Sequence, residues 1–333
     1  MKITYSKAGV NVKKVKKIQN KINRLLFSTA NPFTPKFLAG HYAGIFTIGK
    51  TTLAAHCDGV GTKILVAQAL NKHNTIGIDA VAMNVNDLVC IGAKPIVGLD
   101  YLAISKEDEK LIQQILSGVI NGCKMANIAL IGGETAILSD MFSSPKNKTG
   151  YDLAMSVIGV VENKLIDGSN VKPNQILIGL PSSGLHSNGF SLARKILDIK
   201  KWGKEMLTPT ILYDKIVLKL INECDITAIA HITGGAFSKL SRISNISRCG
   251  FYLENMPQPK GIFSYILDVV KDPKECYRTF NMGIGMVLVA QKNEQDKILD
   301  ICKEYKINAE VIGTTIAKKD VLLNFEGRKI SLL

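Results

Sequence analysis

Short apolar runs that end in polar, glycine-bearing turns recur along both halves of this chain, and they constrain its fold more than any other feature. Leu53–Cys57 leads into Asp58-Gly59, and Gln175–Leu180 leads into Ser182–Gly189. Apolar runs of this length bounded by turn residues are typical of buried strands. Between such runs, apolar residues at helical spacing predict helices, most clearly over 106–127. Strands that alternate with helices predict an α/β or α+β fold.

The length of the chain bounds the number of domains. The chain has 333 residues, and a prior of ~150 residues per domain predicts about two domains. The turn-rich segment 167–174, DGSNVKPN, is the predicted boundary. We therefore expect an N-terminal domain over 1–166 and a C-terminal domain over 167–333, each long enough to bury a core.

The chain is strongly basic. Forty-two Lys and Arg against 28 Asp and Glu give a formal net charge of +14 and a pI of about 9.3. This balance favours anionic partners such as phosphates, nucleotides or nucleic acid. The densest lysines lie within 11–26, where apolar spacing predicts an amphipathic helix with a solvated basic face. Aromatic residues make up only 6% of the chain, which weakens a nucleic-acid function built on base stacking.

Cysteine usage and hydropathy indicate the compartment. The seven cysteines form no CxxC pair, which argues against a disulfide framework and against a thiolate zinc site. The sequence shows neither an apolar leader nor an uncharged apolar run long enough to span a membrane. We therefore expect a soluble protein of the reducing cytoplasm without a membrane partner.

The first candidate site is the segment DGVGTK, which directly follows an apolar run. Gly59 and Gly61 allow backbone N–H groups to approach a phosphate, and Lys63 can neutralise its charge. Asp58 can hold a Mg²⁺ ion that bridges phosphate oxygens, with the Thr62 hydroxyl close by. The spacing is neither a Walker A loop nor GxGxxG, so an ordinary turn is the alternative.

Polar residues on one face of the helix predicted over 78–92 form the second candidate. At about 100° per residue, Asp79, Asn86 and Asp87 fall opposite the apolar side chains. Their oxygens could join Asp58 around a hard cation. The alternative is a face that is simply solvated.

The third candidate follows the strand predicted over 128–131. There Gly132, Gly133, Glu134 and Thr135 place a carboxylate directly after two glycines at a strand end, where functional sites gather. The alternative is a plain tight turn.

Two loops of the second half combine a histidine with hydroxyl and glycine residues. Small residues and free N–H groups at a helix start make an anion site, and a histidine there can donate to a phosphate. The segment 277–283, YRTFNMG, could orient a substrate or simply lead into a strand. The residues of the two loops are His186, Ser187, Asn188 and Gly189, and His231, Thr233, Gly234 and Gly235.

Taken together, these segments resemble the phosphoribosylformylglycinamidine cyclo-ligase family, also called AIR synthetases. The resemblance extends over nearly the whole chain and rests on the full set in its order, because DGVGT, ND and GGET alone fit a wider superfamily of ATP-dependent enzymes. The chain departs from the bacterial pattern at Asn11, over 40–44 and over 137–140. The matching stretches are TYSKAGV (4–10), DGVGTK (58–63), TIGIDAVAMNVNDLVCIGAKP (75–95), GGETA (132–136), SSGLHSNGFSLARKIL (182–197), AHITGGAF (230–237) and YRTFNMGIGM (277–286).

The resemblance implies a two-domain fold with the active-site cleft between the domains. The N-terminal domain would form a β-barrel at a homodimer interface, and the C-terminal domain would be an α/β layer packed beside it. Asp58, Asp87 and Glu134 would lie near Mg²⁺ and the ATP phosphates. The loops at His186 and His231 would face phosphate groups of substrate or nucleotide.

The implied reaction is an ATP-dependent ring closure of purine biosynthesis, with formylglycinamidine ribonucleotide and ATP as substrates. ATP would phosphorylate the amide oxygen, a ring nitrogen would attack, and phosphate would leave. Lys63 would contribute charge, while His186 or His231 would assist the departing phosphate or manage protons, and the two histidines stay open alternatives. A monovalent cation is compatible with this chemistry.

Other activities remain as alternatives. A selenophosphate synthetase would need a reactive cysteine within 40–44, a hydrogenase-maturation dehydratase would need a C-terminal cysteine, and this chain has neither. A thiamine-monophosphate kinase would lack the HSNG and HITGG pair. A basic nucleic-acid-binding protein rests on the net charge alone.

Overall fold

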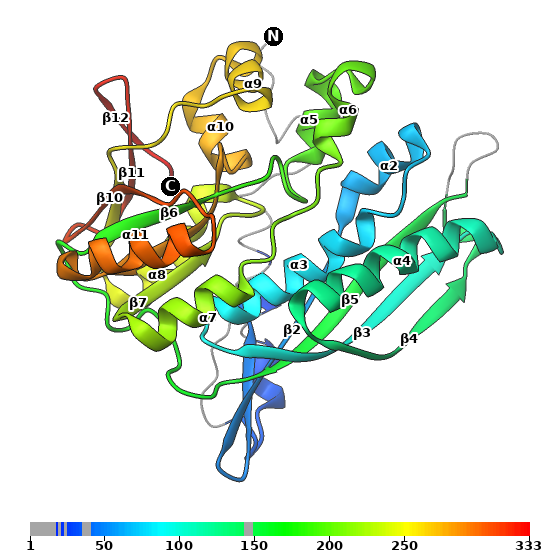
Figure 1. Ribbon diagram of the computed structural model, residues 1–333, viewed down its shortest axis with the longest axis horizontal. Helices are drawn as coiled ribbons and strands as arrows, with labels where there is room; N and C mark the ends of the chain where they lie inside the picture. Colours follow the sequence, from blue (N-terminus) through cyan, green and yellow to red (C-terminus); the bar gives the residue numbers. More distant parts are fainter. Residues whose placement is uncertain (1–17, 19–20, 23–24, 35–40, 143–148) are drawn as a thin grey trace.

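The computed structural model shows two β-sheets, each with helices packed against it (Figure 1). The mixed α/β class expected from the sequence is confirmed. The segment TYSKAGV, Asn11 and most of the helix predicted over 11–26 lie outside the described residues. The structure describes residues 18, 21–22, 25–34, 41–142 and 149–333.

The first sheet uses strands from residues 44–160 and is open. Its strand order is β1-β2-β5-β3-β4, and the pairs are antiparallel except for parallel β3 and β4. The described strands of one chain therefore close no barrel. The strands are β1 (Gly44–Ile48), β2 (Thr51–Gly59), β3 (Lys94–Ile104), β4 (Ala129–Ile137) and β5 (Tyr151–Val160).

Helices α3 (Ile76–Val89) and α4 (Glu109–Ala126) cover one face of this sheet (Figure 1). The two helices approach closely at Gly77, where an added Cβ would lie 2.0 Å from the backbone nitrogen of Val119. All residues of α3 except Ile78 are buried. The polar face predicted on this helix is therefore not solvated, and that alternative is wrong.

The second sheet uses strands from residues 176–331. Its order is β12-β11-β8-β10-β6-β9-β7, antiparallel apart from the parallel pair β11 and β8. Its central strands β6 and β9 are almost entirely buried, as expected for apolar runs covered on both faces. The strands are β6 (Ile176–Pro181), β7 (Ile226–His231), β8 (Gly250–Leu253), β9 (Ile284–Ala290), β10 (Glu310–Ile316), β11 (Val321–Phe325) and β12 (Arg328–Ser331).

The remaining helices are short. Of these, α7 packs against α3 and β3 and so ties the second half to the first. The α-helices are α2 (Ile64–Leu70), α5 (Phe190–Ile196), α6 (Ile199–Met206), α7 (Asp214–Glu223), α8 (Leu240–Ser247), α9 (Ile262–Val270), α10 (Pro273–Thr279) and α11 (Gln295–Glu304). The 3₁₀ turns are η1 (Phe27–Thr29), η2 (Gly61–Lys63), η3 (Ser139–Met141), η4 (Ala236–Lys239) and η5 (Lys292–Glu294).

The connection from β5 to β6 separates the two sheets along the chain. We propose that the domain boundary lies within it, between Ile166 and Asp167, so that residues 1–166 and 167–333 form the two domains. Among the described helices, none combines the length and apolarity needed to cross a membrane.

Candidate active site at the junction of the two halves

Helix α3 carries the polar side chains around which the candidate site is built. Asp79, Asn86 and Asp87 point from it toward segments of the second half, and all three are buried. Buried polar groups require partners, because an unpaired one costs about 1–3 kcal/mol and an unpaired charge costs more. The partners of these three residues therefore show what each residue does.

Asp87 lies between two histidines. His231 Nδ1 donates to Asp87 Oδ1 at 2.7 Å, and His56 Nε2 lies 3.4 Å from Asp87 Oδ2. His56 is held in turn by Asn84, whose Oδ1 lies 3.0 Å from His56 Nδ1. Burial alone would raise the pKa of Asp87, but the charge of Lys239 and the hydrogen bond from His231 hold it well below its usual range. Asp87 is therefore a carboxylate at neutral pH.

His231 ends β7 and is fully buried. Burial lowers its pKa, while the hydrogen bond and charge of Asp87 and the charge of Asp58 oppose that shift. Because Nδ1 donates to Asp87, the neutral ring leaves Nε2 as an acceptor, and Nε2 lies 3.4 Å from Asn86 Nδ2. The aspartate thus fixes the orientation and tautomer of this histidine.

Lys63 and Asp79 form an ion pair that is sealed from solvent. Lys63 Nζ lies 2.7 Å from Asp79 Oδ2, and both side chains are 0% exposed. The ammonium also donates to the Thr208 carbonyl at 2.7 Å, while Asp79 Oδ1 accepts from the Thr210 backbone and hydroxyl. The sequence identified both residues as phosphate- or cofactor-binding, but here each holds the other and the segment 208–210 of the second half.

Asn86 is a second link between the halves. Its Nδ2 donates to the Ile211 carbonyl at 2.8 Å, and its Oδ1 accepts from the Tyr213 backbone N–H at 2.9 Å. Both polar atoms of the amide therefore bind the segment that precedes α7. The structure gives this residue a positioning contact rather than a free oxygen.

The two predicted anion loops meet at the junction. Asn188 Oδ1 lies 2.8 Å from where a Cβ on Gly234 would stand, so the second loop needs glycine there. Gly189 and Gly235 both have positive φ, +79° and +85°, and each precedes a helical turn. The two loops named from the sequence are thus brought together.

The contacts of the first loop differ from those of a free anion site. His186 is buried, and its Nε2 accepts from the Ser183 backbone at 3.3 Å, while Nδ1 has no partner among the described residues. Burial holds the pKa of His186 well below 6.5, so the ring is neutral. Ser187 Oγ lies 3.3 Å from Thr210 Oγ1, beside the buried Lys63–Asp79 pair.

The segment YRTFNMG supports that first loop. Asn281 Oδ1 accepts from Ser182 Oγ at 3.1 Å, and Asn281 Nδ2 donates to the Gly184 carbonyl at 2.8 Å. The Phe280 ring fills the space beside Gly189. This segment therefore holds the loop in place.

The GGET segment lies apart from the rest of the site. It continues within the edge strand β4, so the tight-turn alternative is wrong, and Glu134 is exposed. Across the sheet, Gly59 of β2 is paired with Ala154 of β5, Ala154 with Tyr101 of β3, and Tyr101 with Glu134 of β4. Three strand spacings, about 14 Å, therefore separate the backbone at Gly59 from the backbone at Glu134.

The three predicted metal ligands therefore do not converge within one chain. Across the described residues, no group of three or more His, Cys, Asp or Glu is placed to hold a metal ion. Asp58 is the penultimate residue of β2, where its Oδ1 accepts from the Gly59 N–H at 2.8 Å, and η2 follows with Gly61, Thr62 and Lys63. Asp58 lies close enough to His231 and Lys239 for its charge to act on both of their pKa values.

Sequence reasoning missed two residues of this cluster. His56 stands two residues before Asp58, and the period of two along a strand puts their side chains on one face, a signal that was available. Lys239 follows Gly235 in the segment AFSKLSR, and no spacing in that segment distinguishes it.

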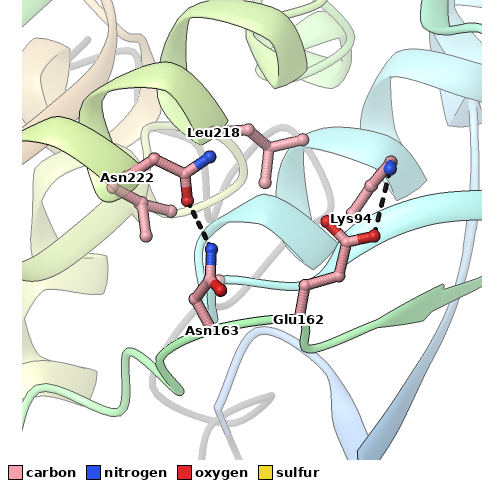
Figure 2. Close-up of a pocket in the computed structure, with 7 residues that line it drawn as sticks. Lys94, Glu162, Asn163, Leu218 and Asn222 are labelled. Atoms are coloured by element: carbon pink, nitrogen blue, oxygen red, sulfur yellow. Dashed lines mark hydrogen bonds and ion pairs between the residues drawn. The ribbon is translucent and has the colours of Figure 1, made fainter.

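A pocket outside this cluster lies where α7 meets the chain after β5. Figure 2 shows Lys94 paired with Glu162 and Asn163 bonded to Asn222. Lys94 Nζ lies 3.0 Å from Glu162 Oε1, and Asn163 Nδ2 donates to Asn222 Oδ1 at 2.7 Å. The Asn163–Asn222 hydrogen bond joins the two halves, whereas the half-exposed Lys94–Glu162 pair lies within the first half.

Comparison with known proteins identifies the family. The sequence model for the AIR synthase related protein, N-terminal domain, matches residues 40–161, and the model for its C-terminal domain matches residues 172–324. The chain belongs to the AIR synthase related protein family. The family resemblance inferred from the sequence motifs is confirmed.

Curated members of the family are similar along the whole chain. A phosphoribosylformylglycinamidine cyclo-ligase of Methanocaldococcus jannaschii is 41% identical over 336 residues, covering 96% of this chain and 94% of that protein. One of Pyrococcus horikoshii is 42% identical, covering 91% and 92%.

Solved structures share the fold of this family member at low identity. AaThiL complexed with AMPPCP and TMP matches with a TM-score of 0.69 at 15% identity, covering 96% of each chain. The HypE–HypF complex matches with a TM-score of 0.68 at 21% identity, covering 92% of this chain and 97% of that chain. At this identity the likeness establishes the fold alone.

Proposed function

We propose that this chain is a phosphoribosylformylglycinamidine cyclo-ligase, converting ATP and formylglycinamidine ribonucleotide into ADP, phosphate and aminoimidazole ribonucleotide. The observation that carries the proposal is the roughly 40% identity to cyclo-ligases over more than 90% of both chains. The clustered Asp87, His231 and paired glycine loops at the junction of the halves support it.

The chemical difficulty of the reaction defines what the site must supply. A formamide carbonyl is a poor electrophile, and its oxygen is a poor leaving group. Phosphorylation by ATP turns that oxygen into a phosphate ester, the amidine nitrogen attacks the carbon, and the C–O bond breaks to release phosphate. The protein positions the two reactants and stabilises the charge of the transferred group.

Asp58 and Asp87 are the residues we assign to Mg²⁺. Mg²⁺ in such sites binds one or two carboxylates and takes its other ligands from substrate phosphates and water. Among the described residues, Asp87 Oδ2 has only the 3.4 Å contact to His56, and Asp58 is the penultimate residue of strand β2. Bound there, Mg²⁺ would neutralise the phosphates of ATP.

We assign proton transfer to His231 rather than His186. Asp87 orients the His231 ring and would stabilise its protonated form as an oriented carboxylate does. His186 has no carboxylate partner among its described contacts and is neutral. It supports the loop that faces a phosphate.

We also propose a homodimer built on the uncovered face of the first sheet, closing the barrel that one chain leaves open. Leu99, Tyr101 and Ile131 on that face are exposed by 38%, 45% and 60%. Apolar exposure of this kind on one face marks an interface. Glu134 lies on the same edge strand, so its predicted role at the ATP site depends on the second copy. The seven free cysteines fit a cytoplasmic enzyme.

Isotope transfer tests the proposed chemistry. The purified protein is given ATP, Mg²⁺ and substrate labelled with ¹⁸O in the formyl carbonyl. The label should appear in inorganic phosphate, because that oxygen leaves with the phosphoryl group. Unlabelled phosphate alongside aminoimidazole product would contradict amide phosphorylation.

Asp87→Asn is the variant for the assigned site. It should lower kcat/KM by about 100-fold or more, since it removes a metal ligand and the partner of His231. Asp225→Asn is the matched control, because Asp225 is an exposed residue paired with Lys164 and its loss should leave kcat/KM within twofold. Equal effects of the two substitutions would remove Asp87 from the site.

A further inference from the structure

Two cations of the second half share one aromatic ring of the first. Lys239 Nζ lies 5.9 Å and Arg242 Cζ 5.2 Å from the centre of the Tyr42 ring. Tyr42 is 1% exposed, and its hydroxyl has no hydrogen-bond partner within the part of the chain that the structure describes. Lys239 ends η4 and Arg242 lies in α8, so the cluster joins both halves beside the second glycine loop.

These cations are poorly satisfied by the protein. Lys239 donates to Thr233 Oγ1, and Arg242 Nη1 donates to the His41 carbonyl at 3.4 Å. In the described part of the chain, neither forms an ion pair with a carboxylate within 4.0 Å. Two ammonium N–H groups and most of the guanidinium fork therefore remain available for an anion.

The chain itself has little to offer as that anion. No aspartate or glutamate precedes Asp58, and none occurs in the undescribed segment 143–148, so the undescribed residues hold no carboxylate at all. Asp87 and Asp58 act on Lys239 only from beyond ion-pair distance. An anionic ligand is therefore the partner that these two side chains have room to bind.

The surrounding groups fit a phosphate. An arginine fork matches phosphate oxygens in two-point geometry, and lysine adds a point charge. The Thr233 hydroxyl and the Gly234-Gly235 turn, with φ of +85° at Gly235, lie beside the cations. A hydroxyl and a left-handed glycine turn are common components of phosphate cradles.

We propose that Lys239 and Arg242, packed on Tyr42, form a phosphate-binding subsite of the active site. The subsite takes a phosphate group carried by ATP, released as inorganic phosphate, or attached to the ribose of the second substrate. It rests on the proposed function for its place in a reaction, but phosphate binding can be measured without turnover.

Binding measurements on the full chain test the subsite. The probes are inorganic phosphate, ribose 5-phosphate and ADP with Mg²⁺, and the readouts are the dissociation constant and the rise of Tm. Lys239→Gln should raise the dissociation constant of the probe that occupies the subsite by about tenfold or more, as expected for a lost charge-assisted bond. Lys239→Arg keeps the charge and should stay within about threefold of wild type. Lys319→Gln, at an exposed lysine, should change nothing.

The probes separate the sources of the phosphate. If Lys239→Gln weakens the binding of ribose 5-phosphate alone, the subsite binds the ribose phosphate. If it weakens the binding of ADP or inorganic phosphate, the subsite binds the nucleotide side. The unliganded Tm should stay within a few degrees of wild type, because Lys239 makes no ion pair with any described residue.

Three results would overturn the inference. They are probe binding by Lys239→Gln within twofold of wild type, no measurable binding of any probe by wild type, and a Lys239→Gln protein that unfolds without ligand. If the wild-type protein turns over substrate but its phosphate binding does not depend on Lys239, the subsite is rejected and the proposed function stands. If phosphate binding depends on Lys239 but the protein shows no turnover, the subsite stands and the proposed function is rejected.

Discussion

At the residue scale, two aspartates on helix α3 have different roles. Asp87 keeps a histidine in place and stays charged, whereas Asp79 is sealed against Lys63. The sequence grouped both aspartates and the lysine by type and spacing. Spacing along a helix identifies a shared face, but it does not show that His231, 144 residues from Asp87, reaches that face.

The Lys63–Asp79 pair gives a prediction about stability. Lys63→Met should lower the free energy of unfolding by about 3–5 kcal/mol, because it leaves a buried carboxylate without a partner. The double variant Lys63→Met, Asp79→Leu should recover most of that loss, since no charge is then buried. Urea unfolding of the two variants measures both values. A loss below ~1 kcal/mol for Lys63→Met, together with a collapse of kcat, would return Lys63 to the catalytic role inferred from the sequence.

At the scale of elements, the loops are held by shapes that only glycine permits. Gly189 has a φ of +79°, and an added Cβ would stand 2.6 Å from the buried ring of Phe280. The glycines were recognisable in the sequence as phosphate-binding signals. The contacts of this loop with residues 279–281 could not be predicted from the sequence, because a local pattern does not show which segments almost a hundred residues apart pack together.

Gly189→Ala separates backbone strain from crowding. Gly327 has the same φ of +79° with nothing within 4 Å of its Cβ position, so Gly327→Ala carries the strain alone, about 1–2 kcal/mol. Gly189→Ala should cost about 1–3 kcal/mol more, because Phe280 must move. Denaturant unfolding of the two variants gives the difference. Equal losses would show that the loop and Phe280 are not tightly packed.

At the scale of the molecule, the described helices cover one face of the first sheet and leave the other face open (Figure 1). Helices α3 and α4 pack on the covered face, and β4 forms an unpaired edge (Figure 1). The α/β or α+β class followed from alternating apolar runs, but the arrangement in two open sheets did not. The short elements α6, α9, β8, β11 and β12 escaped notice because each is too short for periodicity to register.

Ile131→Lys tests the proposed dimer. A charge at this 60% exposed position should convert the dimer into a monomer, because it would be buried against apolar side chains of the second copy. Ile120→Lys is the matched control, since Ile120 is 43% exposed on α4 over the opposite face. Sedimentation velocity should find the control dimeric. A wild-type monomer, or a dimeric Ile131→Lys variant, would contradict this interface.

The central claim is that the chain closes the imidazole ring of aminoimidazole ribonucleotide at the expense of ATP. The most direct measurement follows ADP and the imidazole product together, with purified protein, ATP, Mg²⁺ and formylglycinamidine ribonucleotide. We predict that the two appear one for one and that ADP release needs the second substrate. A folded protein that binds ATP but yields no imidazole would contradict the claim and leave the family with a different substrate.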